Sequence, residues 1–154
     1  MAEVTLVSVR MDGRQPVVVL KESGGDRYLP IYIGAVEYEA IRMGLRGETF
    51  PRPLTHDLLL TVLEQTGDAL ASVRITAFRE NVYFAELVLS SGRTVDTRPS
   101  DALALATRAR CPVECSEDVL ADQGTSVADE QETELERFRE FLDGINPEDF
   151  GADA

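Results

Sequence analysis

A short helix that is apolar on nearly every side is the feature that most constrains this chain. Its core reads Ala-Leu-Ala-Leu-Ala from Ala102 to Ala106, directly after Pro99, which suits a first helical turn, and Ser100, whose hydroxyl can cap exposed N–H groups. A helix without a polar face belongs in the interior of a protein. The polar side chains at its start must therefore be paired within the fold or used at a site. These are Asp96, Arg98, Ser100 and Asp101.

Three predicted strands precede this helix, and the same order of elements occurs earlier in the chain. The first set is Val4 to Met11, Pro16 to Glu22 and Tyr28 to Ile33, and the second is Leu70 to Glu80, Val82 to Ser90 and Arg93 to Thr97. The Asp12-Gly13 pair predicts a tight hairpin in the first set. From Ala35 the apolar period becomes helical, with one apolar stripe. The stripe comprises Val36, Ala40, Ile41, Met43 and Leu45.

The two sets resemble each other when the chain is shifted along itself so that Ser8 falls on Ser72. This shift aligns Ser8-Val9-Arg10 with Ser72-Val73-Arg74, and Glu37 with Asp101. We interpret this as an internal duplication of a strand-strand-strand-helix unit, with chance agreement as the alternative. The predicted fold class is α+β, with duplicated units, an extra buried helix between them and a C-terminal acidic amphipathic helix.

The extra helix is predicted from the leucine-rich run that starts at Leu58 and ends before Gly67. Thr55 is the predicted N-cap of this helix, and Asp57 favours its N-terminus through the helix dipole. Because the run is rich in leucine, we expect the helix to be buried.

Charge divides the chain into a body and a tail. The net charge is −13, but residues 1–115 hold 15 acidic and 13 basic residues, whereas residues 116–154 hold 13 acidic and 2 basic ones. We predict a domain over residues 1–120, a linker over 121–128, an acidic amphipathic helix over 129–146 and a flexible tail over 147–154. The apolar stripe of that helix is Leu135, Phe138, Phe141 and Leu142.

Two cysteines and the hydropathy pattern bear on the expected location. Cys111 and Cys115 have no second pair of ligands to complete a zinc site, so packed or free thiols in a reducing compartment are expected. The sequence contains no uninterrupted apolar run of the length that a membrane-spanning helix needs. We expect a cytoplasmic protein with no membrane segment.

Several residues suit phosphate binding. Helix N-termini carry partial positive charge and unpaired N–H groups, so Arg52 and Arg98, each just before a predicted helix, could seat phosphates together with Thr55 and Ser100. The alternative is that each arginine pairs with a nearby carboxylate and holds a corner of the fold.

Acidic residues and the single histidine supply candidates for catalysis. Glu37, Asp57 and Asp101 could together bind Mg²⁺ or Mn²⁺, and His56 could act as a general base near neutral pH. The alternative is that each acid serves only its helix dipole, and that His56 is an ordinary hydrogen-bonding residue. No pattern for an organic cofactor is present.

Three motifs in order resemble those of the bifunctional nuclease domain family. They are Ile31-Tyr32-Ile33-Gly34 with Glu37, the segment Arg52-Pro53-Leu54-Thr55-His56-Asp57-Leu58, and the segment from Asp96 to Ala106. The resemblance covers about residues 1–120 and extends into the tail. It implies a compact α+β fold of duplicated units, association as a homo-oligomer, with a dimer favoured, and degradation of DNA and RNA, which is credited to plant relatives.

Two functions follow as hypotheses. The first is a nuclease with little sequence preference, in which the arginines seat phosphates, the three acids hold a metal ion and His56 moves a proton. The second is a non-catalytic oligomeric scaffold or regulatory binding module, in which the same residues form structural ion pairs.

Overall fold

The structure is a computed structural model that describes residues 1–126. The chain divides into two units, Met1–Gly124 and a unit that begins at Thr125. The elements of the first unit are β1 (Ala2–Asp12), β2 (Gln15–Glu22), β3 (Arg27–Tyr32), α1 (Ala35–Arg46), α2 (Thr55–Gln65), β4 (Leu70–Arg79), β5 (Val82–Leu89), β6 (Thr94–Thr97), α3 (Pro99–Ala109), β7 (Val113–Cys115) and α4 (Glu117–Gln123). The second unit begins with the short strand β8 (Thr125–Ser126).

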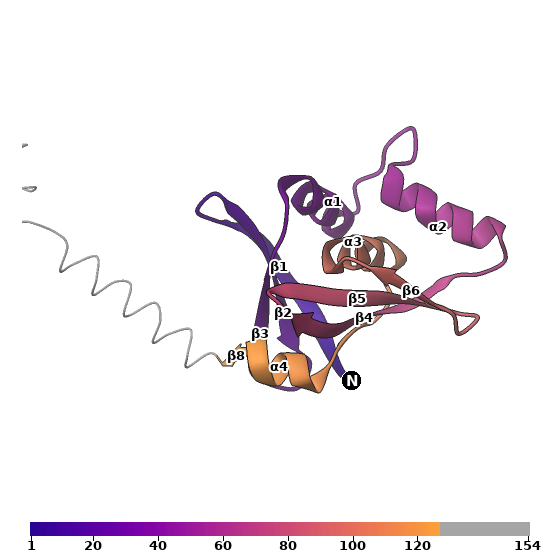
Figure 1. The fold of residues 1–154 in the computed structure, drawn as a ribbon. Coiled ribbons are helices and arrows are strands. Elements are labelled where there is room, and N and C mark those ends of the chain that lie inside the picture. The colour runs from indigo at the N-terminus through magenta and orange to yellow at the C-terminus, as the bar shows by residue number, and fades with distance from the viewer. Residues whose placement is uncertain (127–154) are drawn as a thin grey trace, which may run out of the picture. The chain divides into compact units, whose positions relative to one another are not determined.

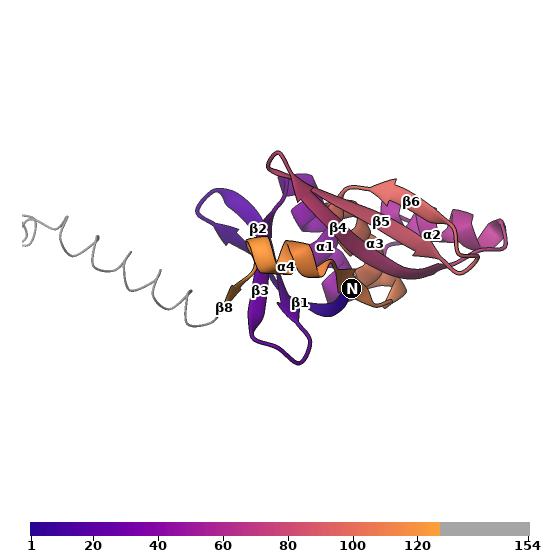
Figure 2. The ribbon, with the colours of Figure 1, turned by 60° about the horizontal axis from the view of Figure 1, so that its bottom comes forward.

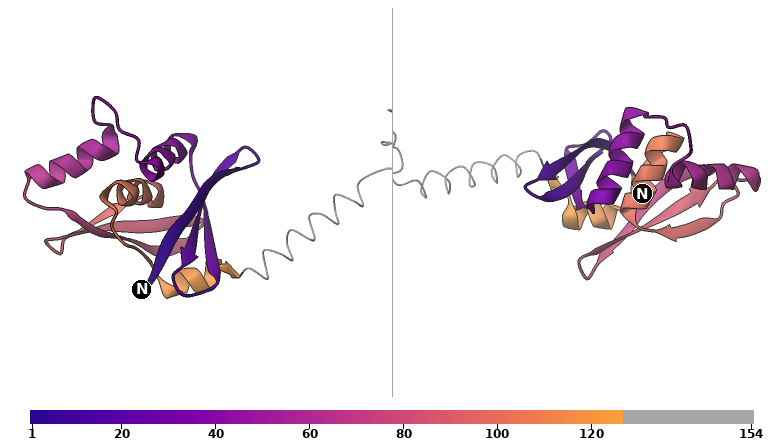
Figure 3. Two further views of the ribbon diagram at one scale, coloured as in Figure 1. Left: turned by 180° about the vertical axis from the view of Figure 1, so that it is seen from behind. Right: turned by 90° about the horizontal axis from the view of Figure 1, so that it is seen from above.

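The strands of the first unit form one sheet in the order β6-β5-β4-β7-β1-β2-β3. The short strand β7 joins the halves, because it pairs antiparallel with β1 and parallel with β4. Helices α1, α2 and α3 lie on one side of β4, β5 and β6, and α4 lies on the other (Figure 1). Figure 2 brings α4 to the front of the strands, and Figure 3 shows α1, α2 and α3 from behind and from above. The predicted α+β class is confirmed.

The duplication is visible in the pairing of the strands as well as in their order. When β1 pairs with β2, Leu6 and Ser8 face successive partners and Val7 is skipped, which is a β-bulge. When β4 pairs with β5, Leu70 and Ser72 do the same and Ala71 is skipped. The shift that places Ser8 on Ser72 also places Val7 on Ala71. The repeated bulge therefore supports the internal duplication independently of residue identity.

Helix α3 is the central element of the core. Seven of its residues are buried, and Leu103 and Ala104 are fully inaccessible to solvent. It packs against α1, α2, β4 and β5, so it has neighbours around most of its circumference. The prediction of a buried helix here is confirmed, and its cause is the absence of a polar face over the Ala-Leu-Ala-Leu-Ala run.

The prediction that α2 is a buried helix is wrong. None of its residues is buried, and Leu58, Leu59 and Val62 are 51%, 41% and 47% exposed. Leu60 and Leu63 are partly buried against the core, where α3 is the main neighbour of α2, and the other apolar residues of α2 lie outside this contact. Of the stripe predicted on α1, Ala40 and Ile41 are buried, whereas Val36 and Leu45 are exposed.

The predicted helix caps also differ from the observed ones. Leu54, not Thr55, is the N-cap of α2, because the amide of Leu58 donates to the carbonyl oxygen of Leu54 at 2.8 Å. Arg98 is the N-cap of α3, and Ser100 lies inside the first turn after Pro99. In both helices, the observed N-cap residue therefore lies before the residue whose hydroxyl was expected to act as the cap.

Other predictions fall near the end of the described chain. Cys111 and Cys115 are free thiols, half-buried and buried respectively, as expected. Helix α4 runs to Gln123, so residues 121–123 of the predicted linker are helical. The predicted acidic helix over 129–146, with its stripe, and the predicted tail over 147–154 lie outside the described residues.

Candidate functional site

Arg98 joins the first turns of α1 and α3. Its Nη1 donates to Oε1 of Glu37 at 3.0 Å, and its Nε donates to Oδ2 of Asp101 at 2.9 Å. Glu37 and Asp101 are each the third residue of their helix, where a carboxylate is stabilised by the helix dipole. Glu37 and Asp101 occupy equivalent positions in the two repeats. The site therefore forms where the N-terminus of α1 meets the N-terminus of α3.

The guanidinium of Arg98 is accessible even though it is paired. Its side chain is 64% exposed, against 19% for Glu37 and 31% for Asp101. The hydrogen bond from Arg98 to Asp101, followed by the charge of Asp101 and the hydrogen bond to Glu37, raises the pKa of Arg98 above its ordinary value. Arg98 therefore presents a permanent positive charge at the surface and is not a buried structural partner.

His56 extends the cluster from the start of α2. Its Nε2 lies 3.1 Å from Oδ1 of Asp101, and its side chain is 17% exposed. A carboxylate only accepts hydrogen bonds, so Nε2 carries the hydrogen, and in the neutral ring the lone pair lies on Nδ1. An acid that fixes the tautomer of a histidine in this way prepares its other nitrogen to accept a proton. We call Glu37, His56, Arg98 and Asp101 the bridging cluster.

An open groove of about 380 Å³ lies beside the bridging cluster. Glu37, Arg98 and Ser100 line one part of it, and Tyr32 and Tyr83 line another. Tyr32 is 55% exposed, and its hydroxyl donates to Oδ2 of Asp12 at 2.8 Å. Burial raises the pKa of Tyr83 to about 12, so its hydroxyl stays protonated at neutral pH. The groove thus offers a cation, hydroxyl groups and aromatic surface to a polar ligand.

Asp57 does not join Glu37 and Asp101. Its Oδ1 accepts from Nε of Arg108 at 3.1 Å, and its Oδ2 accepts from the amide of Leu54 at 3.3 Å. The side chain of Arg108 is only 9% exposed, and its Nη1 also donates to the carbonyl oxygens of Ala40 and Ala104. This pair ties α2 to α1 and α3, which is a structural role.

The arrangement of acids does not fit the predicted metal ion. Within residues 1–126, no three side chains of His, Cys, Asp or Glu are grouped so that they could hold one. Glu37 and Asp101 approach each other only through the guanidinium of Arg98, whose positive charge offsets one of their two negative charges. A divalent cation would need carboxylate oxygens that face one another directly. Binding of Mg²⁺ or Mn²⁺ stays a prediction.

The remaining predicted site residues lie around the cluster without joining it. Arg52 is exposed in the loop before α2 and makes no hydrogen bond or ion pair with the described part of the chain, and Thr55 is exposed at the first position of α2. Ser100 is 8% exposed and lines the groove. Asp96 is exposed on β6, opposite Glu86 of β5.

Sequence reasoning missed some residues that shape the site. Gln15 and Asn81 line the groove, and Arg108 holds Asp57. Asn81 follows Glu80 in the β4–β5 turn, and both have positive φ, at 62° and 52°. A turn between two predicted strands could have indicated such a conformation. The sequence has no signal, however, that this turn lies at the same groove as the N-terminus of α3.

His56 lines a second groove and is not part of the lining of the groove beside Arg98. The second groove has a volume of about 440 Å³ and is lined mainly by apolar residues of α1 and by the start of α2, with Arg108 and His56 among its lining. His56 therefore contributes to this groove while it contacts Asp101 of the bridging cluster.

Comparison with known proteins gives matches over nearly the whole chain. A family model described as the bifunctional nuclease domain matches residues 18–128. The uncharacterized protein Rv1829 of Mycobacterium tuberculosis (strain H37Rv) is 41% identical over 163 residues, which cover 99% of each chain. No helix among residues 1–126 is long and apolar enough to span a membrane.

Plant proteins give more distant matches. Bifunctional nuclease 1 of Oryza sativa subsp. japonica is 28% identical over 117 residues, which cover 72% of this chain and 35% of the plant protein. Bifunctional nuclease 2 of Arabidopsis thaliana is 26% identical over 119 residues, which cover 73% of this chain and 36% of the plant protein. The matched region thus spans about a third of each plant protein.

Proposed function

Because this chain belongs to the bifunctional nuclease domain family, we propose that it hydrolyses phosphodiester bonds of DNA and RNA with little sequence preference. The observation that carries this proposal is the bridging cluster: an exposed arginine held between two acids, one of which also contacts a histidine, at the edge of an open groove. The names of the plant relatives support the same substrate class.

Each member of the bridging cluster has a distinct role in this proposal. Arg98 contacts the phosphate, since its guanidinium is exposed and can exchange one carboxylate partner for a phosphate oxygen. Asp101 orients His56, whose Nδ1 takes the proton of the attacking water and then returns it to the leaving oxygen as the P–O bond breaks. Glu37 holds Arg98 at the rim of the groove when no ligand is bound. Arg52, exposed before α2, is an additional candidate for phosphate contact.

The second candidate function is a regulatory binding module without catalysis. It is favoured by the charges of the cluster, because two carboxylates surround a single guanidinium and the sum is negative when His56 is neutral. Such a cluster attracts anions less strongly than a free arginine would. The nuclease and the binding module therefore predict different effects of substitutions in the bridging cluster on cleavage of nucleic acid.

The deciding experiment incubates the full-length protein with labelled single- and double-stranded DNA and RNA, with and without Mg²⁺ or Mn²⁺. We expect cleavage by the wild type and a loss of about 100-fold or more in Asp101→Asn and His56→Gln, as for removal of a general base. The matched control is Glu22→Gln, because Glu22 also pairs with an arginine, Arg27, and lines neither groove that contains a cluster residue. Cleavage of none of the substrates, or equal cleavage by folded Asp101→Asn, would favour the binding module.

We also propose that the protein forms a homo-oligomer, in the first place a dimer. The exposed apolar residues Leu58, Leu59 and Val62 on the outer side of α2 support this proposal, since a second copy would remove them from water. The free thiols support a reducing compartment, and on that basis we propose a cytoplasmic location.

A further inference from the structure

A cavity of about 250 Å³ lies at the opposite end of α3 from the bridging cluster. The cavity results from the short length of β7. Val113 of β7 pairs with Val4 of β1, but the residues before Val113 no longer pair with β1. The carbonyl oxygen of Pro112 still accepts a hydrogen bond from the amide of Val73 on β4. The two halves of the sheet therefore separate beside Leu6. The end of α3 fills this gap only in part.

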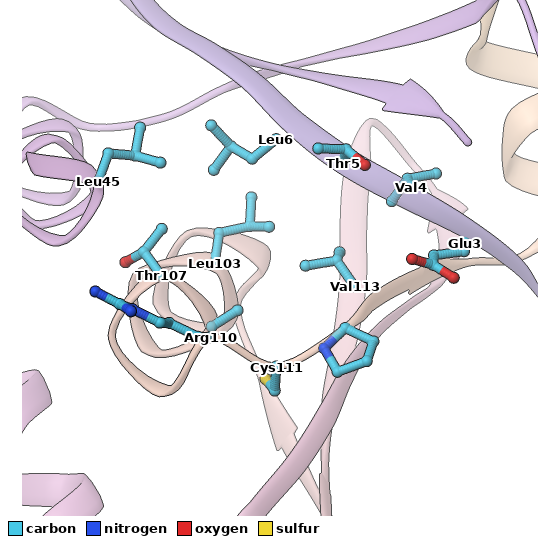
Figure 4. A pocket seen from close by; sticks show the side chains of 12 residues that line it. Glu3, Val4, Thr5, Leu6, Leu45, Leu103, Thr107, Arg110, Cys111 and Val113 are labelled. Carbon is cyan, nitrogen blue, oxygen red and sulfur yellow. The ribbon is translucent and has the colours of Figure 1, made fainter. Parts of the chain in front are cut away.

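The interior of the cavity is apolar. Leu6, Leu103 and Val113 face it from β1, α3 and β7, and Leu45 approaches from the end of α1 (Figure 4). Leu103 and Val113 are buried, but Leu45 is 46% exposed. Burial also raises the pKa of the Cys111 thiol, which lines the same cavity. An occupant with an apolar body would remove this surface from water.

The charged residues lie at opposite ends of the cavity. Figure 4 shows Arg110 beside Thr107 on one side and Glu3 on the other. Arg110 is exposed and makes no hydrogen bond or ion pair through its side chain to residues 1–126. Arg110 also has a left-handed backbone, with φ of 55°, at the C-terminus of α3, a position where glycine is the usual residue. This conformation turns the chain into β7 and leaves the arginine at the rim.

We propose that this cavity binds a short apolar molecule with one carboxylate, with its apolar body against Leu6, Leu103 and Val113 and its carboxylate on Arg110. The volume lies below the range of about 300 to 1,000 Å³ typical of drug-sized sites, so the ligand is smaller than a nucleotide. Arg110 selects an anion at one end, and Glu3 disfavours a second anionic group at the other. The site is separate from the bridging cluster and does not depend on nuclease activity.

The test uses hexanoate, hexan-1-ol and hexylamine as probes of the full-length protein. Binding is followed by ¹³C-methyl NMR shifts of Leu6, Leu103 and Val113. We expect hexanoate to bind at least 5-fold more tightly than hexan-1-ol, and hexylamine to bind most weakly. Arg110→Gln should remove the preference for hexanoate without changing the affinity for hexan-1-ol, whereas the control Arg14→Gln, in the turn between β1 and β2, should change neither.

A second variant tests the cavity itself. Ala106 is 5% exposed and lines the cavity, so Ala106→Leu should fill part of it and lower the affinity for hexanoate and hexan-1-ol alike by at least 5-fold. Circular dichroism and thermal unfolding establish that each variant is folded. Unshifted methyl signals in the wild type, or equal hexanoate affinity in wild type and folded Arg110→Gln, would overturn the proposal.

Discussion

At the scale of single residues, the absence of a side chain at Gly34 leaves room for the carboxylate of Glu37, which reaches Arg98. A methyl group at Gly34 would overlap the carboxylate of Glu37, and the same close approach occurs at Gly25 with the carboxylate of Glu22. Neither glycine has the positive φ that would itself require glycine. At both positions a neighbouring acid folds back over the glycine to meet an arginine, Arg98 for Glu37 and Arg27 for Glu22.

Gly34→Ala should therefore separate Glu37 from Arg98. Because exposed ion pairs contribute only about 0–1 kcal/mol, we expect the free energy of unfolding to fall by about 1 kcal/mol or less. Nucleic-acid binding should change by a larger factor, and fluorescence anisotropy with a labelled oligonucleotide measures it. Gly25→Ala is the matched control, because it disturbs an ion pair of the same kind away from the groove. Identical binding by the two variants would contradict a role for Glu37 in the site.

Cys115 gives a second prediction at this scale. Burial, together with the charge of Glu117, raises the pKa of this thiol from about 9 to about 12. The neutral thiol is thus favoured in the folded state, so its contribution to stability is complete below pH 9 and is lost as pH rises from 9 to 12. The wild type should lose about 1.4 kcal/mol per pH unit from this group in that range. Urea unfolding at pH 7, 9 and 10 measures the slope.

Cys115→Ala should be less stable than the wild type at pH 7, since it leaves a cavity beside Ile75, but its stability should fall less steeply above pH 9. Cys111→Ala is the comparison, because the pKa of that half-buried thiol is also raised by burial. An unchanged slope in Cys115→Ala would show that this thiol does not titrate on unfolding.

At the scale of elements, the close contact between α1 and α3 depends on Gly44. A methyl group there would meet Oγ1 of Thr107 and approach Nη1 of Arg108. Arg108 crosses the same contact to reach the carbonyl oxygen of Ala40. The absence of a side chain at Gly44 thus lets α3 hold α1 at the distance that places their N-termini beside each other.

Gly44→Ala should destabilise the protein by about 1–3 kcal/mol, as overpacking does, although alanine favours a free helix by about 1 kcal/mol over glycine. Denaturant unfolding measures the change. Thr107→Ala removes the hydroxyl that the new methyl group would meet, so the double variant should recover part of the loss. A more stable Gly44→Ala protein would mean that the two helices can separate at no cost.

The elements also show what sequence patterns can and cannot predict. Alternation and turn residues located the strands, because both arise from the local geometry of a strand and its hairpin. The burial of α3 was predictable because Leu103, Ala104 and their neighbours leave no polar face. The exposure of Leu58 and Leu59 was not, since a leucine-rich helix does not reveal how many neighbours will pack on it. The contact between Glu37 and Arg98 joins residues 61 positions apart, and only the packing of the two helices brings them together.

At the scale of the whole molecule, the unit Met1–Gly124 leaves an apolar surface on the outer side of α2. If this surface joins two copies, Leu59→Lys should shift the protein to monomers, because a buried lysine without a partner is costly. Gln65→Lys adds the same charge to an exposed position of the same helix and should leave assembly unchanged. Light scattering after size-exclusion chromatography measures the mass. Retention of the wild-type mass by Leu59→Lys would place the interface elsewhere.

The position of Arg98 in the repeat has a consequence for the origin of the site. The shift that aligns the two halves places Arg98 opposite Gly34, and Asp101 opposite Glu37. Two identical copies of the first half would bring two acids together with no cation between them, and such a pair would repel. The site therefore depends on the difference between the halves. The repeat brings the two helix ends together, and the difference at one position, with glycine in one half and arginine in the other, supplies the cation between their acids.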